Sequence, residues 1–115
     1  ATVQAAQAVL AKELPEHLGL IGFNTFRGDR FVQLCSITYD KGTALRQLAQ
    51  ERGIAPSDVV CVGDWFNDEP MFDVGAQGYA MAHATDVLKA RAHGVLEAGR
   101  QGGAVAEVAR RVWGL

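Results

Sequence analysis

The sequence has no large excess of either charge, no long apolar run and few cysteines. Its 115 residues include 11 basic and 13 acidic side chains, for a net charge of −2. This balance provides no cationic surface for nucleic acid or an anionic membrane. No segment approaches the ~20 consecutive apolar residues of a membrane span. We therefore expect a chain that binds neither nucleic acid nor membrane.

Two cysteines, Cys35 and Cys61, are too few for a disulfide scaffold, and each lies in an apolar stretch. Residues 1–10 lack a basic segment, so we expect no signal peptide. Hydrophobic residues make up 49% and charged residues 21% of the chain, which is typical of a globular protein. Together these features predict a cytoplasmic protein with reduced thiols.

The first 38 residues predict a helix followed by a β-hairpin. Apolar residues recur at spacings of three and four through residues 1–14, as in an amphipathic helix. Residues 19–26 and 30–38 are rich in Phe, Ile, Val and Thr, and a turn signal, Arg27-Gly28-Asp29, separates them.

Strand and helix patterns alternate from Lys41 onward. Thr43 is expected to cap the first helix, Asn67 a short one and Thr85 a third. The apolar run 59–62 is typical of a parallel strand that is covered on both faces. Further strands are expected at residues 78–81 and 95–96, and helices after Thr85 and over residues 104–112. This alternation predicts an α/β fold with a parallel sheet.

Two carboxylates follow the strand at residues 59–62. Asp64 stands at its carboxyl end, where open α/β sheets bind ligands, and Asp68 comes four positions later. Gly63 leaves the backbone free to turn between them and the strand. Close carboxylates repel unless a cation or proton separates them, and Mg²⁺ suits an oxygen-only site. Alternatively, Asp68 interacts with a helix dipole and Asp64 is a loop residue.

Lys41 lies between a predicted strand and a predicted helix start. A lysine in such a place can contact a phosphate as a point charge, and the neighbouring backbone N–H groups add to the positive field. Taken alone, a lysine of this kind is most often a solvated surface residue.

At this point the sequence resembles a known family. Lys41-Gly42 with the downstream element Gly63-Asp64-x-x-Asn67-Asp68 is similar to the haloacid dehalogenase (HAD) superfamily of phosphatases. The similarity continues through residues 70–72, 78–84, 87–90 and 102–105. It is strongest for the Cof-like sugar-phosphate phosphatases, whose core carries an inserted α/β cap. His83 departs from the pattern, because this subgroup commonly has Asn there.

The resemblance implies a domain organisation and a role for each candidate residue. Residues 1–36 would be the end of the cap, and residues 37–115 the second half of a Rossmann-like catalytic core. Asp64 would ligate Mg²⁺, and Asp68 would ligate it or hold its waters. Asn67 would orient the phosphate, and Lys41 would neutralise charge on the nucleophile and the phosphoryl group. The substrate would be a small phosphorylated metabolite.

The family's nucleophile is the first aspartate of an Asp-x-Asp element, and these 115 residues contain no such element. The chain therefore resembles the C-terminal part of a HAD phosphatase. An alternative is a non-catalytic module that acts through self-association or a partner. The resemblance also implies that the strand at residues 59–62 lacks a neighbour on one side, so we expect a homodimer through that exposed edge.

Other candidates have less support. His17, His83 and His93 lack metal-ligand spacing and are expected on the surface or in loops. Trp65 and Phe66 could contact substrate, although packing is the commoner use of adjacent aromatic residues.

Overall fold

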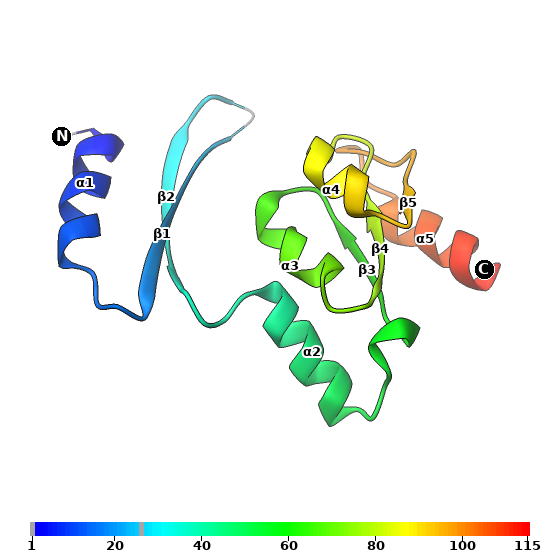
Figure 1. Ribbon diagram of the computed structural model, residues 1–115. Coiled ribbons are helices and arrows are strands. Elements are labelled where there is room, and N and C mark those ends of the chain that lie inside the picture. Colours follow the sequence, from blue (N-terminus) through cyan, green and yellow to red (C-terminus); the bar gives the residue numbers. More distant parts are fainter. Residues whose placement is uncertain (1, 26) are drawn as a thin grey trace. The chain divides into compact units, whose positions relative to one another are not determined.

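The computed structural model describes residues 2–25 and 27–115. These form two compact units, Ala1–Tyr39 and Asp40–Leu115, each described here by itself (Figure 1). Within the described residues, none of the helices combines the length and the apolar character needed to cross a bilayer.

The first unit is a helix and an antiparallel hairpin, as the sequence predicts. Its elements are α1 (Val3–Glu13), β1 (Leu18–Asn24) and β2 (Arg30–Ser36). Phe23 and Phe31 lie opposite one another in the ladder, and their rings stack with centroids 5.9 Å apart. None of the described residues of this unit is buried, and Leu34 and Ile37 are more than half exposed. The hairpin thus has no core of its own.

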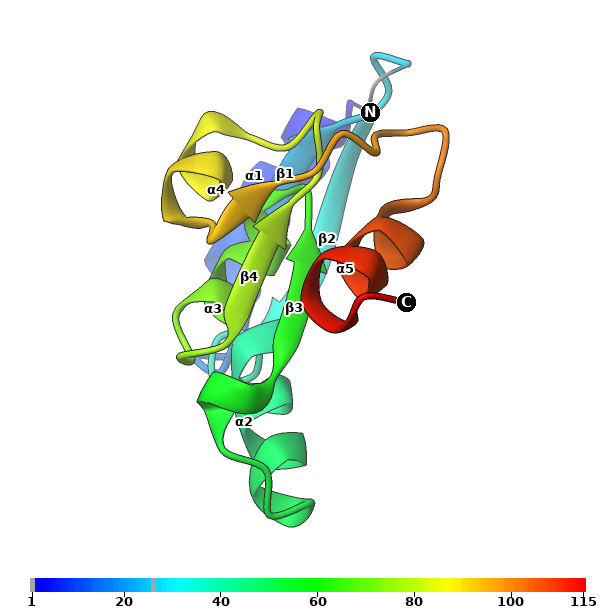
Figure 2. The ribbon, with the colours of Figure 1, turned by 90° about the vertical axis from the view of Figure 1, so that its right-hand side faces the viewer.

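The second unit is a parallel α/β structure, which confirms the predicted fold class. In chain order its elements are α2 (Lys41–Glu51), the 3-10 turn η1 (Pro56–Asp58), β3 (Val60–Gly63), the 3-10 turn η2 (Phe66–Asp68), α3 (Glu69–Phe72), β4 (Gln77–Ala80), α4 (Asp86–Arg91), β5 (Gly94–Val95) and α5 (Ala104–Trp113). The strands are parallel and lie in the order β3-β4-β5 (Figure 2).

Helices cover both faces of this sheet. On one face Cys61 packs with Val74 and Ala76 beneath Met71 and other residues of the α2–α3 layer. On the other face Val60 and Val62 pack against a cluster of Leu96, Ala104 and Val108 that includes residues of α5. Figure 1 shows α3 and α5 on opposite sides of the strands. Burial on both faces explains why residues 59–62 form an unbroken apolar run.

Two predicted helix caps are wrong. The cap of α2 is Asp40, whose carboxylate accepts from the Thr43 N–H at 2.7 Å, while the Thr43 hydroxyl accepts from the Asp40 N–H at 2.9 Å. This is a reciprocal capping box, with Thr43 at its third helical position. Asn67 lies within η2 and does not cap α3, whose N-cap position is Asp68 with no side-chain cap bond. The predicted cap at Thr85 is confirmed, since its hydroxyl accepts from the Leu88 N–H.

β3 is an edge strand among the described residues, because β4 is its sole partner there. The Val59 carbonyl accepts from the N–H of Gln77 in β4 at 2.8 Å, and the Gly63 carbonyl accepts from the N–H of Met81, directly after β4, at 3.0 Å. Since successive residues of a strand alternate, the backbone N–H and C=O of Val60 and Val62 point away from β4. The outer edge of β3 therefore presents unpaired polar backbone groups.

Candidate active site

Asp68 holds the loop that follows β3 in place through hydrogen bonds. Its Oδ2 accepts from the backbone N–H groups of Asp64 and Trp65, at 2.9 and 3.2 Å. Its Oδ1 accepts from the Lys41 ammonium at 2.5 Å. Asp68 is only 4% exposed, and among the described residues it is the one charged residue that is buried. One carboxylate thus ties the start of α2 to the carboxyl end of β3.

Two glycines allow this close arrangement. A Cβ added at Gly63 would lie 2.6 Å from the Asp68 Cβ, and one at Gly42 would lie 2.3 Å from the Pro70 carbonyl oxygen. Such distances are far inside van der Waals contact. Gly63 therefore lets the loop fold back onto β3, and Gly42 lets α2, which carries Lys41, approach α3.

The surroundings of Asp68 favour its ionised form. Burial alone would raise the pKa of the carboxyl, but the Lys41 hydrogen bond and the two backbone N–H donors outweigh it. The net effect lowers the pKa of Asp68 below its ordinary value of 3.8. The carboxylate is therefore a fixed negative charge at neutral pH.

Asp64 faces outward at the end of β3 and meets His83. The Asp64 Oδ2 lies 2.9 Å from His83 Nε2, and the two side chains are 42% and 20% exposed. His83 sits after β4, the neighbouring strand, so two strand ends supply this pair. The sequence patterns assign no role to His83. Its departure from the family pattern, directly beyond a strand end, was the signal that could have identified it.

The four predicted site residues lie in one part of the second unit, but they do not all touch. Lys41 and Asp68 form an ion pair, and Asp68 binds the Asp64 backbone. Asn67 is exposed, and its side chain makes no hydrogen bond within the described residues. His17 and His93 are exposed and lie apart from this group in the sequence.

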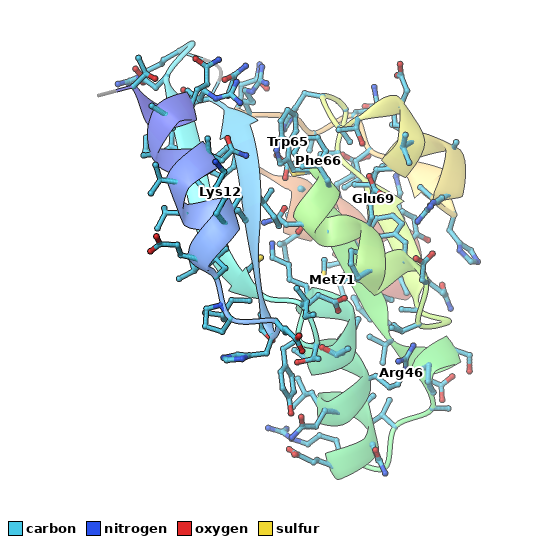
Figure 3. The ribbon with its side chains drawn as sticks, turned by 60° about the vertical axis from the view of Figure 1, so that its left-hand side comes forward. Lys12, Arg46, Trp65, Phe66, Glu69 and Met71 are labelled. Carbon is cyan, nitrogen blue, oxygen red and sulfur yellow. The ribbon has the colours of Figure 1, made fainter. Side chains whose placement is uncertain are left out.

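Two aromatic side chains lie in the loop that follows β3, between Asp64 and Asp68. The Trp65 and Phe66 rings contact one another, with centroids 4.5 Å apart and planes inclined by 47°. Figure 3 shows the two side chains together at the end of α3. Phe66 is 44% exposed, so part of this pair remains open to a ligand.

Cys61 lies inside β3, three positions before Asp64. Burial, with a smaller contribution from the negative charge of Asp68, raises the pKa of its thiol to about 11. A thiol that stays protonated at neutral pH is a poor nucleophile. Cys61 is therefore a core residue.

A hollow of about 420 Å³ opens beside His83. Its lining comes from the loops after β4 and β5, and consists of Ala82, His83, Glu97, Gly99, Arg100 and Gln101. The second of these loops is held by Glu107 of α5, whose carboxylate accepts from the backbone N–H groups of Glu97 and Ala98. The Asp64–His83 pair thus has open space next to it.

Comparison with known proteins identifies the family. The profile of the haloacid dehalogenase-like hydrolases matches residues 3–108, which is nearly the whole chain. The chain belongs to this family. The fold agrees: a haloacid dehalogenase-like hydrolase from Bacteroides thetaiotaomicron superposes with a TM-score of 0.79 at 22% identity, covering 96% of this chain and 40% of that one.

Two curated relatives are phosphatases. A phosphoglycolate phosphatase of Methanosarcina acetivorans is 38% identical over 74 residues, covering 64% of this chain and 33% of its own. A 5-amino-6-(5-phospho-D-ribitylamino)uracil phosphatase of Bacillus subtilis is 33% identical over 92 residues, covering 80% and 32%. This HAD chain thus spans about a third of the length of the relatives it matches.

The donor set of the site is compatible with Mg²⁺. The described residues contain no group of three or more His, Cys, Asp or Glu side chains that could enclose a metal ion. Mg²⁺ does not require one, because it is commonly held by one or two carboxylates together with waters and substrate phosphates. Asp64 is the accessible carboxylate, while both oxygens of Asp68 already accept hydrogen bonds.

Proposed function

We propose that this chain is part of a Mg²⁺-dependent phosphatase that hydrolyses a small phosphate monoester. The observation that carries the proposal is the Lys41–Asp68–Asp64 cluster at the carboxyl end of β3. Two similar proteins, which are phosphatases of small phosphorylated metabolites, also support the proposal.

In this proposal Asp64 holds the metal ion, and Asp68 contributes its negative charge and keeps the loop in place. The ion would supply charge neutralisation for the phosphoryl group. Asp68 also restrains the Lys41 ammonium, which is half exposed and so can face a phosphate as well. A preorganised cation beside the reacting phosphoryl group stabilises the negative charge of the transition state.

Asn67 and the aromatic pair would act on the substrate. The Asn67 amide is exposed on the same loop and can donate to a phosphate oxygen. The exposed part of Phe66 offers apolar contact to the remainder of the substrate. The nucleophile is not assigned to this chain, because its sequence has no Asp-x-Asp element.

The metal site is tested by replacing Asp64 with asparagine. Without a substrate phosphate, Mg²⁺ should bind the chain weakly, with a dissociation constant on the order of millimolar. Asp64→Asn should weaken binding at least about tenfold, because it removes the accessible carboxylate. Calorimetric titration measures both, with Asp58→Asn, an exposed carboxylate of η1, as the control. Equal affinity in Asp64→Asn and the parent chain would refute the assignment.

We also propose that the 115-residue chain forms a homodimer through the outer edge of β3. Unpaired N–H and C=O groups on an apolar strand are a template for a second copy. Val60→Pro is the matched test: it removes one outward N–H at the first position of an edge strand, where proline is tolerated. Light scattering across a dilution series should give a dimer for the parent chain and a monomer for Val60→Pro.

Hydrogen exchange supplies the second readout for the dimer. The amides of Val60 and Val62 should exchange more slowly as the chain is concentrated, because pairing with a second copy protects them. If the first 38 residues covered the edge within one chain, protection would not depend on concentration. A monomer at every concentration with those amides fully protected would exclude the dimer.

A further inference from the structure

His83 is oriented by its contact with Asp64. An ionised carboxylate can only accept a hydrogen bond, so at a separation of 2.9 Å the His83 Nε2 is the atom that carries the hydrogen and donates it. The ring therefore directs one defined N–H at Asp64 Oδ2. Within the part of the chain that the structure describes, it is the one hydrogen bond of the Asp64 side chain.

The opposite side of the ring has no such partner. His83 Nδ1 is buried and has no hydrogen-bond partner within the described residues. In the neutral ring, with its hydrogen on Nε2, Nδ1 is a hydrogen-bond acceptor. The ring is thus held by packing at its Nδ1 side and by Asp64 at its Nε2 side.

We propose that His83 is a positioning residue for the metal site, and this inference rests on the proposed role of Asp64. By donating to Oδ2, His83 fixes the rotation of the Asp64 carboxylate, so that the remaining oxygen is presented to the cation. Hydrogen bonds to metal-ligating carboxylates commonly govern affinity in this way. A free carboxylate on an exposed loop would instead lose rotational freedom on binding the ion.

Because Nε2 is the nitrogen of His83 that donates to Asp64, substitution of His83 by glutamine and by asparagine should have different effects. The amide nitrogen of glutamine can reach the position of a histidine Nε2, whereas that of asparagine lies nearer the position of Nδ1. Because Asp64 is contacted by Nε2, His83→Gln can retain the hydrogen bond. His83→Asn cannot reach it from the same backbone and resembles His83→Ala in this respect.

The test uses Mn²⁺ as the probe on the full 115-residue chain, with bound ion measured by electron paramagnetic resonance. His83→Ala and His83→Asn should weaken Mn²⁺ binding about tenfold, the lower end of the effect expected when a hydrogen bond to a metal ligand is lost. His83→Gln should stay close to the parent chain. Urea midpoints for the four proteins verify that each is folded.

The outcomes separate this inference from the proposed function. If Asp64→Asn binds Mn²⁺ as tightly as the parent chain, the metal site itself is refuted. If Asp64→Asn loses binding while His83→Ala and His83→Asn keep it, only the positioning role is overturned. Equal loss in the glutamine and asparagine variants would overturn it too. So would a nitrogen coupling to bound Mn²⁺ in the electron spin echo, because His83 would then be a ligand.

Discussion

Replacing Asp68 with alanine is expected to lower the free energy of unfolding by about 3 kcal/mol, because it leaves three partly buried donors without their acceptor. The Asp64 and Trp65 N–H groups and the Lys41 ammonium all donate to this one carboxylate. Asp68→Asn keeps the size of the side chain but replaces one accepting oxygen with an amide that donates. It should cost about 2 kcal/mol. Urea unfolding followed by circular dichroism measures both values.

Asp58→Asn is the matched control, since Asp58 is exposed in η1 and lies in the same unit. A surface change of this kind should stay within about 0.5 kcal/mol of the parent chain. If Asp68→Ala falls within the same range, the carboxylate does not hold the loop. Should the alanine variant fail to fold, Asp68→Asn still gives a measurable difference.

The same carboxylate predicts a pH dependence of stability. The pKa of Asp68 in the folded chain lies below its ordinary value of 3.8, so the unfolded chain takes up this proton first as the pH falls. The contribution of Asp68 is therefore fully present above about pH 4 and is lost as the pH falls through the folded-state pKa. The difference in stability between the parent chain and Asp68→Asn should be largest near neutral pH and should shrink under acid conditions. A constant difference would contradict the ionic contribution.

Sequence patterns were sufficient where the structure depends on local spacing. The apolar run at residues 59–62 predicts a strand that is covered on both faces, and β3 is such a strand. Asp68 follows Asp64 by only four positions, and its carboxylate binds the Asp64 backbone. Each of these interactions lies within a few residues of chain, where periodicity and turn preferences act.

Local patterns do not predict which of two suitable residues caps a helix. They also do not predict a contact whose two residues lie far apart in the sequence. Asp40 and Thr43 are both good N-cap residues, and the capping box uses both, with Asp40 at the cap. Lys41 meets Asp68 across 27 positions, and His83 meets Asp64 across 19. Such contacts depend on how α2 docks on α3 and on the order of β3 and β4. Neither feature is encoded in a local period.

The isolated 115-residue chain is expected to release phosphate from an aryl phosphate no faster than buffer does, with or without Mg²⁺. In the proposed function Lys41, Asp64 and Asp68 supply positive charge, a metal ligand and a fixed loop, and none of them is the nucleophile. The resemblance to the family implies that an Asp-x-Asp element carries out the covalent step. The 115 residues of this chain contain no such element. Release of inorganic phosphate measures the rate.

The comparison that decides this prediction is between the parent chain and Asp64→Asn. Both should remain at the buffer rate, because electrostatic stabilisation without a nucleophile leaves the covalent route closed. Turnover by the parent chain that disappears in Asp64→Asn would contradict the prediction and require a nucleophile within these 115 residues. Conversely, a longer polypeptide that adds an in-frame Asp-x-Asp element should be active, and there Asp64→Asn should reduce the rate at least about 100-fold, as expected for loss of transition-state charge stabilisation.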